Sequence, residues 1–335
     1  MSRLRAAGLL ALVLALVAAG CGSSAHGDPR PSPSRRSDPL AGLRLYVVPS
    51  APAVAQARIW QAAGRRRDAV AIERIASQPT ATWLTGSRSD AGTARGLAAA
   101  AARAGRIPLL TLYDIPNRDC HGYSSGGARS SSAYLGWVAS IANAIGDRGA
   151  IVILEPDAID QATGGCHDRA AAMATFRLLG HAVGTLKSRA GGHIHVYIDA
   201  GNSGWQSVNA IAGPLLTADV RQADGFALNV ANFQTTQASI AYGTALSRLV
   251  GGKHFVIDTG RNGAGPASGG MQSWCNPTGR ALGQAPTTDP GTPLVDALLW
   301  VKYPGESDGS CGRGDPSAGQ WWPGYALGLA ERTAG

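Results

Sequence analysis

The chain has 335 residues, 44% of them hydrophobic. This is enough to bury a core, and it excludes a wholly disordered or collagen-like chain. The formal charge of +8 raises the question of a nucleic-acid partner, but five of the 30 basic residues precede residue 40. No dense Lys/Arg block occurs beyond that point, so a protein that follows the phosphates of a nucleic acid is disfavoured.

The N-terminus has the pattern of an export signal. Residues 1–21 combine a basic start, a long apolar run and small residues before Cys21, as secretory signal peptides do. The ending Ala18-Ala19-Gly20-Cys21 resembles a bacterial lipobox, which predicts lipidation of Cys21; ordinary cleavage nearby is the alternative. Residues 22–39 are rich in Ser, Pro and Arg and predict a tether, which leaves 40–335 as the folded domain. We expect an exported protein, either extracellular or lipid-anchored at the outer face of the bacterial cell membrane.

Two kinds of segment alternate from about Leu40 onward. Short apolar runs predict strands at Leu43–Val48, Thr82–Leu84, Ile107–Tyr113, Ala150–Leu154, His195–Ile198, Phe226–Val230, Phe255–Ile257 and Ala297–Val301. Ala/Arg-rich stretches between them predict helices at Ala53–Ser77, Ala91–Ala104, Ser132–Ile145, Ala170–Arg189 and Gln237–Val250. The alternation indicates a parallel sheet covered on both faces. Eight strands in one domain favour an α/β barrel over an open doubly wound sheet.

Carboxylates and amides stand at the ends of six consecutive predicted strands. They lie in the segments 114–119, 155–157, 199–202, 231–232, 258–262 and 302–308. Active sites of α/β barrels form from the loops at the carboxyl ends of the strands. We therefore expect these side chains to share one face, whereas residues that only stabilise a fold would be scattered.

The cysteines predict two disulfide bonds. The chain has five cysteines, an odd number that would leave one cysteine unpaired in an exported protein. Setting Cys21 aside leaves four. Cys120 and Cys166 follow the third and fourth predicted strands, and Cys275 and Cys311 follow the seventh and eighth. Neighbouring loops on one barrel face can come within bridging distance, which loops across the barrel cannot easily do. The expected pairs are therefore Cys120–Cys166 and Cys275–Cys311.

The residue types at the strand ends favour acid–base chemistry. Carboxylates without matching histidines argue against a zinc site, and we expect neither a metal nor a cofactor. Glycoside hydrolysis needs one carboxylic acid to protonate the glycosidic oxygen and a second group to activate water or attack the sugar. Trp83, Trp205 and Trp274 lie near strand ends, where their rings could stack on sugars. Each tryptophan alone could instead belong to the core.

Six segments resemble glycoside hydrolase family 6, the endoglucanase and cellobiohydrolase cellulases, in order over about residues 42–332. They are 113–120, 155–157, 197–201, 258–263, 274–277 and 300–308. The resemblance implies a single-domain, distorted and incomplete parallel β/α barrel, similar to a TIM barrel. It also implies inverting hydrolysis of β-1,4-glucan or cello-oligosaccharide. We expect a monomer whose sole contact with a membrane is the possible N-terminal lipid anchor.

The resemblance also implies roles for the acidic residues. Asp157 matches the general acid, and Asp119 matches a second aspartate whose charge would hold Asp157 protonated and which could relay a proton through water. Asp308 matches the proposed base, an assignment that is contested within the family. Asp199 resembles a structural or substrate-side carboxylate.

Further positions match the cleft of that family. Tyr113 and Ser125 match residues that crowd the scissile sugar and hold the water. Stacking and polar contacts to substrate are implied for Trp83, Trp274, Asn232, Arg280, Lys302 and Glu306. Asn202 stands where many members carry His, and it can donate a hydrogen bond to sugar but cannot be cationic.

Purely structural roles are the alternatives for several of the same residues. Asp119 and Asp199 could form scaffold ion pairs with Arg118 or Arg261. Glu155 is favoured as a buried, hydrogen-bonded support, and Lys302 and Glu306 could pair with each other.

Short loops after the third predicted strand and after Asp308 favour an open cleft and internal cutting. The sequence therefore predicts an endo-β-1,4-glucanase. The alternatives are an exo-acting cellobiohydrolase of the same family and a non-catalytic glucan-binding lipoprotein. A scaffold barrel and a solute-binding lipoprotein are the other classes considered.

Overall fold

Seven short strands form one parallel sheet whose spatial order follows the chain. In this computed structural model the described residues are 38–189, 191, 193–269 and 273–333. The strands are β1 Thr82–Leu84, β2 Leu109–Leu112, β3 Ala150–Leu154, β4 Ile194–Asp199, β5 Gly225–Leu228, β6 His254–Asp258 and β7 Val295–Leu299. The predicted signal peptide, Cys21 and nearly all of the predicted tether lie outside the described residues.

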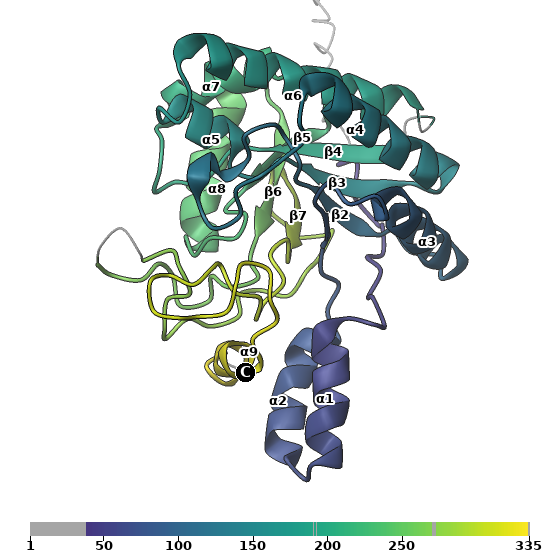
Figure 1. Ribbon diagram of the computed structural model, residues 1–335, viewed down its shortest axis with the longest axis vertical. Helices are drawn as coiled ribbons and strands as arrows, with labels where there is room; N and C mark the ends of the chain where they lie inside the picture. The colour runs from purple at the N-terminus through teal and green to yellow at the C-terminus, as the bar shows by residue number, and fades with distance from the viewer. Residues whose placement is uncertain (1–37, 190, 192, 270–272, 334–335) are drawn as a thin grey trace, which may run out of the picture. The chain divides into compact units, whose positions relative to one another are not determined.

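The sheet curls into an incomplete barrel, as predicted (Figure 1). Among the described residues no ladder of hydrogen bonds joins β7 back to β1. Two hydrogen bonds span this gap: the Ala81 amide donates to the Trp300 carbonyl at 3.0 Å, and Trp83 Nε1 donates to the Val301 carbonyl at 2.8 Å. The barrel is therefore open beside β1 and β7, where a ligand can approach the strand ends.

The prediction of eight strands is wrong by one. The run Leu43–Val48 makes only an isolated parallel bridge, between Leu45 and Ile107. The neighbouring strand, β2, begins only at Leu109, because Pro108 has no N–H to donate to a ladder. The segment 43–48 therefore crosses the sheet edge without forming a strand.

Each predicted helix is present, one of them as two helices. The helices are α1 Pro52–Ala62, α2 Arg66–Ala76, α3 Asp90–Arg103, α4 Ser131–Ile145, α5 Ala158–Thr163, α6 Arg169–Arg189, α7 Val208–Thr217, α8 Thr236–Leu249 and α9 Pro323–Glu331, with 3₁₀ turns η1 Asp119–His121 and η2 Gly146–Arg148. Of these, α5 and α7 lie where no helix was predicted. The single helix expected over Ala53–Ser77 is two helices, because Gly64 has φ +76° and reverses the chain between them. Hydroxyl caps start three helices: Ser130, Ser207 and Thr235 each accept a backbone N–H three residues on.

Helices α3, α4, α6, α7 and α8 pack side by side, in that order, around the outer face of the sheet (Figure 1). Strand β3 shows the consequence, because Val152 packs toward the helices while Ile151 and Ile153 fill the barrel interior. A third cluster joins α1, α2 and α9 through Trp60, Trp300 and neighbouring side chains. Both faces of the sheet are thus covered, as a parallel sheet requires.

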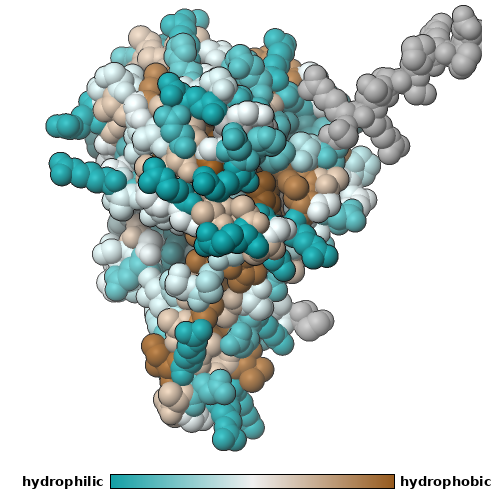
Figure 2. All heavy atoms as spheres, turned by 90° about the vertical axis from the view of Figure 1, so that its right-hand side faces the viewer, coloured by the Kyte–Doolittle hydropathy of each residue, from teal (hydrophilic) through white to brown (hydrophobic). Residues whose placement is uncertain are grey.

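The surface mixes polar and apolar side chains. On the face drawn in Figure 2, hydrophilic residues are spread widely, with apolar residues between them. Across the part of the chain that the structure describes, no helix combines the length and apolarity that crossing a membrane would take.

Candidate active site

The acidic residues predicted for catalysis converge at the carboxyl ends of the strands. Asp157 follows β3, Asp199 is the last residue of β4, Asp119 lies in η1, and Asp308 lies in the segment after β7. Asp119 and Asp308 are close enough to act electrostatically on Asp157. The pattern of polar residues after six predicted strands therefore correctly identified one shared face.

Asp157 has the properties of a carboxyl that stays protonated near neutral pH. Its burial first, and then the negative charge of Asp119, raise its pKa to about 7. The sequence predicted the effect of Asp119 but not that burial would be the larger cause. Asp157 also has φ +69°, a left-handed conformation that is uncommon outside glycine.

Asp199 holds the backbone of Asp157 in place. Its Oδ2 accepts the Asp157 amide at 2.8 Å and the Gly201 amide at 3.2 Å. Its side chain is almost fully buried, and this burial, followed by the charge of Asp157, raises its pKa. These contacts fit the structural role expected for Asp199.

Asp119 is positioned by a strained and cross-linked loop. Asp119, Cys120 and His121 all have positive φ, between 44° and 67°, which an unsupported loop would not keep. The predicted Cys120–Cys166 disulfide ties this loop to the segment after α5. The Asp119 carboxylate accepts the Ser124 amide, and Gln161 Nε2 donates to it at 3.3 Å.

The two arginines do not pair with Asp119 or Asp199. Arg118 lies 3.9 Å from Asp114 and donates to the backbone carbonyls of Tyr113 and Ser124. Arg261 pairs with Asp308 instead. The ion pairs considered for Asp119 and Asp199 are therefore not formed, and the sequence missed the Arg261–Asp308 pair.

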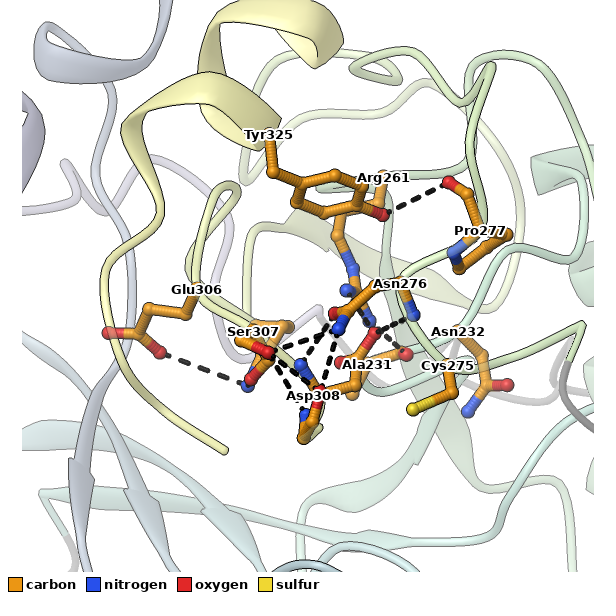
Figure 3. A network of polar contacts seen from close by, with 12 residues as sticks. Ala231, Asn232, Arg261, Cys275, Asn276, Pro277, Glu306, Ser307, Asp308 and Tyr325 are labelled. Atoms are coloured by element: carbon orange, nitrogen blue, oxygen red, sulfur yellow. Dashed lines mark hydrogen bonds and ion pairs between the residues drawn. The ribbon is translucent and has the colours of Figure 1, made fainter. Parts of the chain in front are cut away.

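Asp308 lies in a dense polar network (Figure 3). Its Oδ2 is 2.8 Å from Arg261 Nη1 and accepts the Asn276 amide at 3.1 Å. The Asp308 amide donates in return to Asn276 Oδ1 at 2.7 Å. The second predicted disulfide, Cys275–Cys311, closes the segment that carries these contacts. Asp308 is thus fixed as one member of a buried ion pair.

A pocket of about 650 Å³ opens over the gap in the barrel. It is lined by five predicted site residues, Trp83, Tyr113, Ser125, Lys302 and Glu306. The Trp83 and Tyr113 rings meet edge to face with centroids 5.2 Å apart. Burial, followed by the charges of Asp157 and Asp119, raises the pKa of Tyr113, so this ring connects the pocket to the acidic residues.

The two charged residues of the pocket are only loosely paired. Lys302 Nζ lies 3.9 Å from Glu306 Oε2, donates to the Ser307 carbonyl at 3.2 Å, and sits 5.8 Å from the centroid of the Trp83 ring. The predicted alternative, a pair between Lys302 and Glu306, exists but leaves polar atoms of both side chains near the pocket. An aromatic face beside a lysine and a carboxylate suits a sugar, which offers both apolar faces and hydroxyls.

The remaining predicted contacts lie outside this pocket. Trp205 and Trp274 are exposed, at 40% and 42%. Asn202 is buried, and its Oδ1 accepts the Gly204 amide. The Asn232 side chain donates to the Val230 carbonyl, and Arg280 Nη1 donates to the carbonyls of residues 264 and 265.

Glu155 is the buried support that the sequence favoured. Its carboxyl is fully buried and accepts the amides of Asp114 and Ile115 at 3.0 to 3.1 Å. Asp258 has a comparable role between strands, since it accepts the amides of Ala231 and Lys302. Both residues fix the loops that carry the site.

The fold and the site are those of the glycosyl hydrolase class: a curled parallel sheet, carboxyls converging at its strand ends and an aromatic pocket beside them. The chain belongs to the glycosyl hydrolases family 6, whose family model matches residues 40–333. This confirms the resemblance found in the sequence.

Named relatives agree with this membership. The chain is 44% identical to endoglucanase A of Cellulomonas fimi over 280 residues, which is 82% of this chain and 59% of that protein. It is 38% identical to endoglucanase A of Thermobispora bispora, over 92% of this chain and 66% of that protein. The chain thus spans about three fifths to two thirds of these two proteins. It spans 90% of endoglucanase 1 of Streptomyces halstedii, at 39% identity over 87% of this chain.

Solved structures share the fold. The endoglucanase Cel6 of Mycobacterium tuberculosis, in complex with methyl-cellobiosyl-4-deoxy-4-thio-β-D-cellobioside, has a TM-score of 0.82 and 43% identity; the match covers 88% of this chain and 99% of that one. The endoglucanase Cel6B of Humicola insolens has a TM-score of 0.77 and 27% identity, over 89% of this chain and 99% of that one.

Proposed function

We propose that this protein is an endo-β-1,4-glucanase that hydrolyses internal bonds of a glucan chain with inversion at the anomeric carbon. The observation that carries the proposal is the convergence of carboxyls at the strand ends, where Asp157, just after β3, lies within electrostatic reach of Asp119 and Asp308, and burial raises its pKa to about 7. The endoglucanase names of the relatives and the thio-cello-oligosaccharide bound to the Mycobacterium tuberculosis Cel6 support the substrate class.

In the proposed reaction Asp157 donates its proton to the glycosidic oxygen as the bond to the anomeric carbon breaks. A water molecule attacks that carbon from the opposite face, and its proton passes to a carboxylate. Asp308 is the proposed acceptor, and Asp119 is the proposed relay beside Asp157. Two separate carboxyls, one protonated and one ionised, are what inverting hydrolysis requires.

The pocket residues are proposed to hold the sugar on one side of the scissile bond. Trp83 would stack on its apolar face, and Lys302 and Glu306 would bind hydroxyls. Tyr113 would crowd the scissile sugar, and Ser125 would hold the attacking water.

Other contacts are proposed along the same strand-end face, beyond the pocket. Exposed Trp205 and Trp274 offer stacking surfaces. Asn202, Asn232 and Arg280 would contribute hydrogen bonds through the N–H groups that the protein does not already engage.

Export is part of the proposal, and the sequence of residues 1–39 supports it. The signal-like segment and Cys21 would place the enzyme outside the cell, free or held by a lipid anchor, where it would act as a monomer. The alternative of an exo-acting enzyme draws on weaker relatives, such as exoglucanase 3 of Agaricus bisporus at 29% identity.

The effect of the protein on carboxymethylcellulose distinguishes the endo-acting, exo-acting and non-catalytic alternatives. An endoglucanase lowers the viscosity steeply for each reducing end it creates, and we expect this behaviour from the full chain. A slow fall in viscosity with steady release of a short sugar would favour the exo-acting alternative. Binding of cello-oligosaccharide without any new reducing ends would favour the non-catalytic glucan-binding protein.

A further inference from the structure

Asp160 is a half-buried acidic residue that neither the sequence motifs nor the proposed reaction uses. It lies in α5, three residues and therefore about one helical turn after Asp157. Its Oδ1 is buried and has no hydrogen-bond partner. Among the described residues no cation pairs with its carboxylate, although the chain forms such pairs at several other aspartates.

The described residues around Asp160 offer its Oδ1 no hydrogen-bond donor. On one side lies Gly201, where an added Cβ would be 3.3 Å from Asp160 Oδ1 and 3.2 Å from Trp205 Cε3. Gly201 brings the loop after β4 directly against the carboxylate and supplies no side chain to pair with it. A buried oxygen without a hydrogen-bond donor destabilises a fold, and such an atom in a native structure calls for an explanation.

The charged and titratable groups around Asp157 and Asp160 are mostly acidic. Burial is the largest cause that raises the pKa of Asp157, and the charges of Asp119, Asp160 and Asp308 follow, while Lys302 opposes them. Asp199 and Tyr242, on β4 and α8, also respond to the charge of Asp160. Tyr113, which responds to the charge of Asp157, is a neutral phenol that offers no positive charge.

We propose that Asp160 is a positioning residue that keeps Asp157 in its carboxylic-acid form by placing a further negative charge one helical turn behind it. This inference rests on the proposed role of Asp157 as the general acid. Burial raises the pKa of Asp160 only to about 6, so near pH 7 Asp160 carries negative charge and opposes the ionisation of Asp157. The carboxylate would thus be retained for catalysis at a cost in stability.

The substitution Asp160→Asn in the full chain tests this directly, because it removes the charge and keeps the shape. We expect the alkaline limb of the kcat/KM profile to move to lower pH by about one unit, the size of effect that a nearby buried charge produces. We expect the melting temperature at pH 7.5 to stay the same or to rise. Asp219→Asn is the matched control: it removes a carboxylate from an exposed turn and keeps a residue that tolerates its φ of +58°.

A second readout does not depend on activity. The carboxyl ¹³C signal of Asp157 should titrate near pH 7 in the unsubstituted protein and lower in Asp160→Asn, with Asp160→Leu as a second variant should the amide fold poorly. An unchanged titration and an unchanged alkaline limb would overturn the proposal. A fall in melting temperature without either shift would also overturn it, because it would assign Asp160 a structural role. Lack of hydrolysis by the unsubstituted protein would instead refute the proposed function.

Discussion

Arg261 and Asp308 form a buried ion pair in which Nη1 and Oδ2 are 2.8 Å apart and the side chains are 1% and 6% exposed. Arg261 comes from the segment after β6, and Asp308 from the segment after β7, so the pair fixes two neighbouring strand-end loops against each other (Figure 3). A second guanidinium nitrogen donates to the Ala231 carbonyl after β5. Arg261 therefore ties three consecutive loops to the proposed base.

Replacement of Arg261 is expected to be costly. Arg261→Met leaves Asp308 as an uncompensated buried charge, which should lower the free energy of unfolding by about 3–5 kcal/mol. Arg65→Met is the matched control, because Arg65 pairs with Asp68 at an exposed position and should cost at most about 1 kcal/mol. Denaturant unfolding of both variants checks this prediction. Equal losses in the two variants would show that the buried pair contributes no more than a surface pair.

The pH dependence of hydrolysis should reflect Asp157. A general acid must be protonated, and the pKa of Asp157 is raised to about 7, so kcat/KM should fall as the pH rises through about 7. Above that point the fall should approach tenfold per pH unit. Measuring kcat/KM for a soluble cello-oligosaccharide over a series of pH values defines this alkaline fall. Activity that keeps rising up to pH 9 would contradict the assignment of the acid.

The Cys120–Cys166 disulfide should matter for both stability and rate. It closes a long segment, with a sequence separation of 46, so replacing both cysteines by serine should lower the free energy of unfolding by about 2–5 kcal/mol. Because Asp119 and its neighbours have left-handed backbone conformations, the freed loop should also relax and lower kcat. Measuring kcat well below the melting temperature separates the two effects. An unchanged kcat would mean that the bond does not position Asp119.

Glu155 should make stability decrease with rising pH. Burial raises its pKa in the folded protein to about 8, from an ordinary value of 4.5. Its contribution is therefore fully present below the unfolded-state value and is lost as the pH rises toward and through about 8. Glu155→Gln removes the titration, so its unfolding free energy should vary less between pH 5 and pH 8 than that of the unsubstituted chain. Parallel curves for the two proteins would contradict this prediction.

Local patterns predicted much of this architecture. The apolar runs located seven strands to within a few residues. The polar residues that follow consecutive strands predicted that the acidic site lies on one face of the sheet's end. The disulfides were predictable for the same reason, because neighbouring strands place their loops side by side. Glu155 was correctly favoured as a support.

The missed features depend on tertiary context. The run 43–48 has the composition of a strand, but its pairing depends on a partner that Pro108 shortens. Arg261 and Asp308 are 47 residues apart, and no periodicity connects them. Asp160 belongs to a six-residue helix that the sequence did not predict, and the loop that packs against its carboxylate comes after β4.

The most direct test of the central claim is the stereochemistry of the product. Proton NMR of a short cello-oligosaccharide incubated with the full chain should show the α-anomer of the new reducing end first. The same signal should be lost in Asp157→Asn and kept in Asp219→Asn, which establishes inverting hydrolysis with Asp157 as the acid. First appearance of the β-anomer, or undiminished cleavage by Asp157→Asn, would contradict the account.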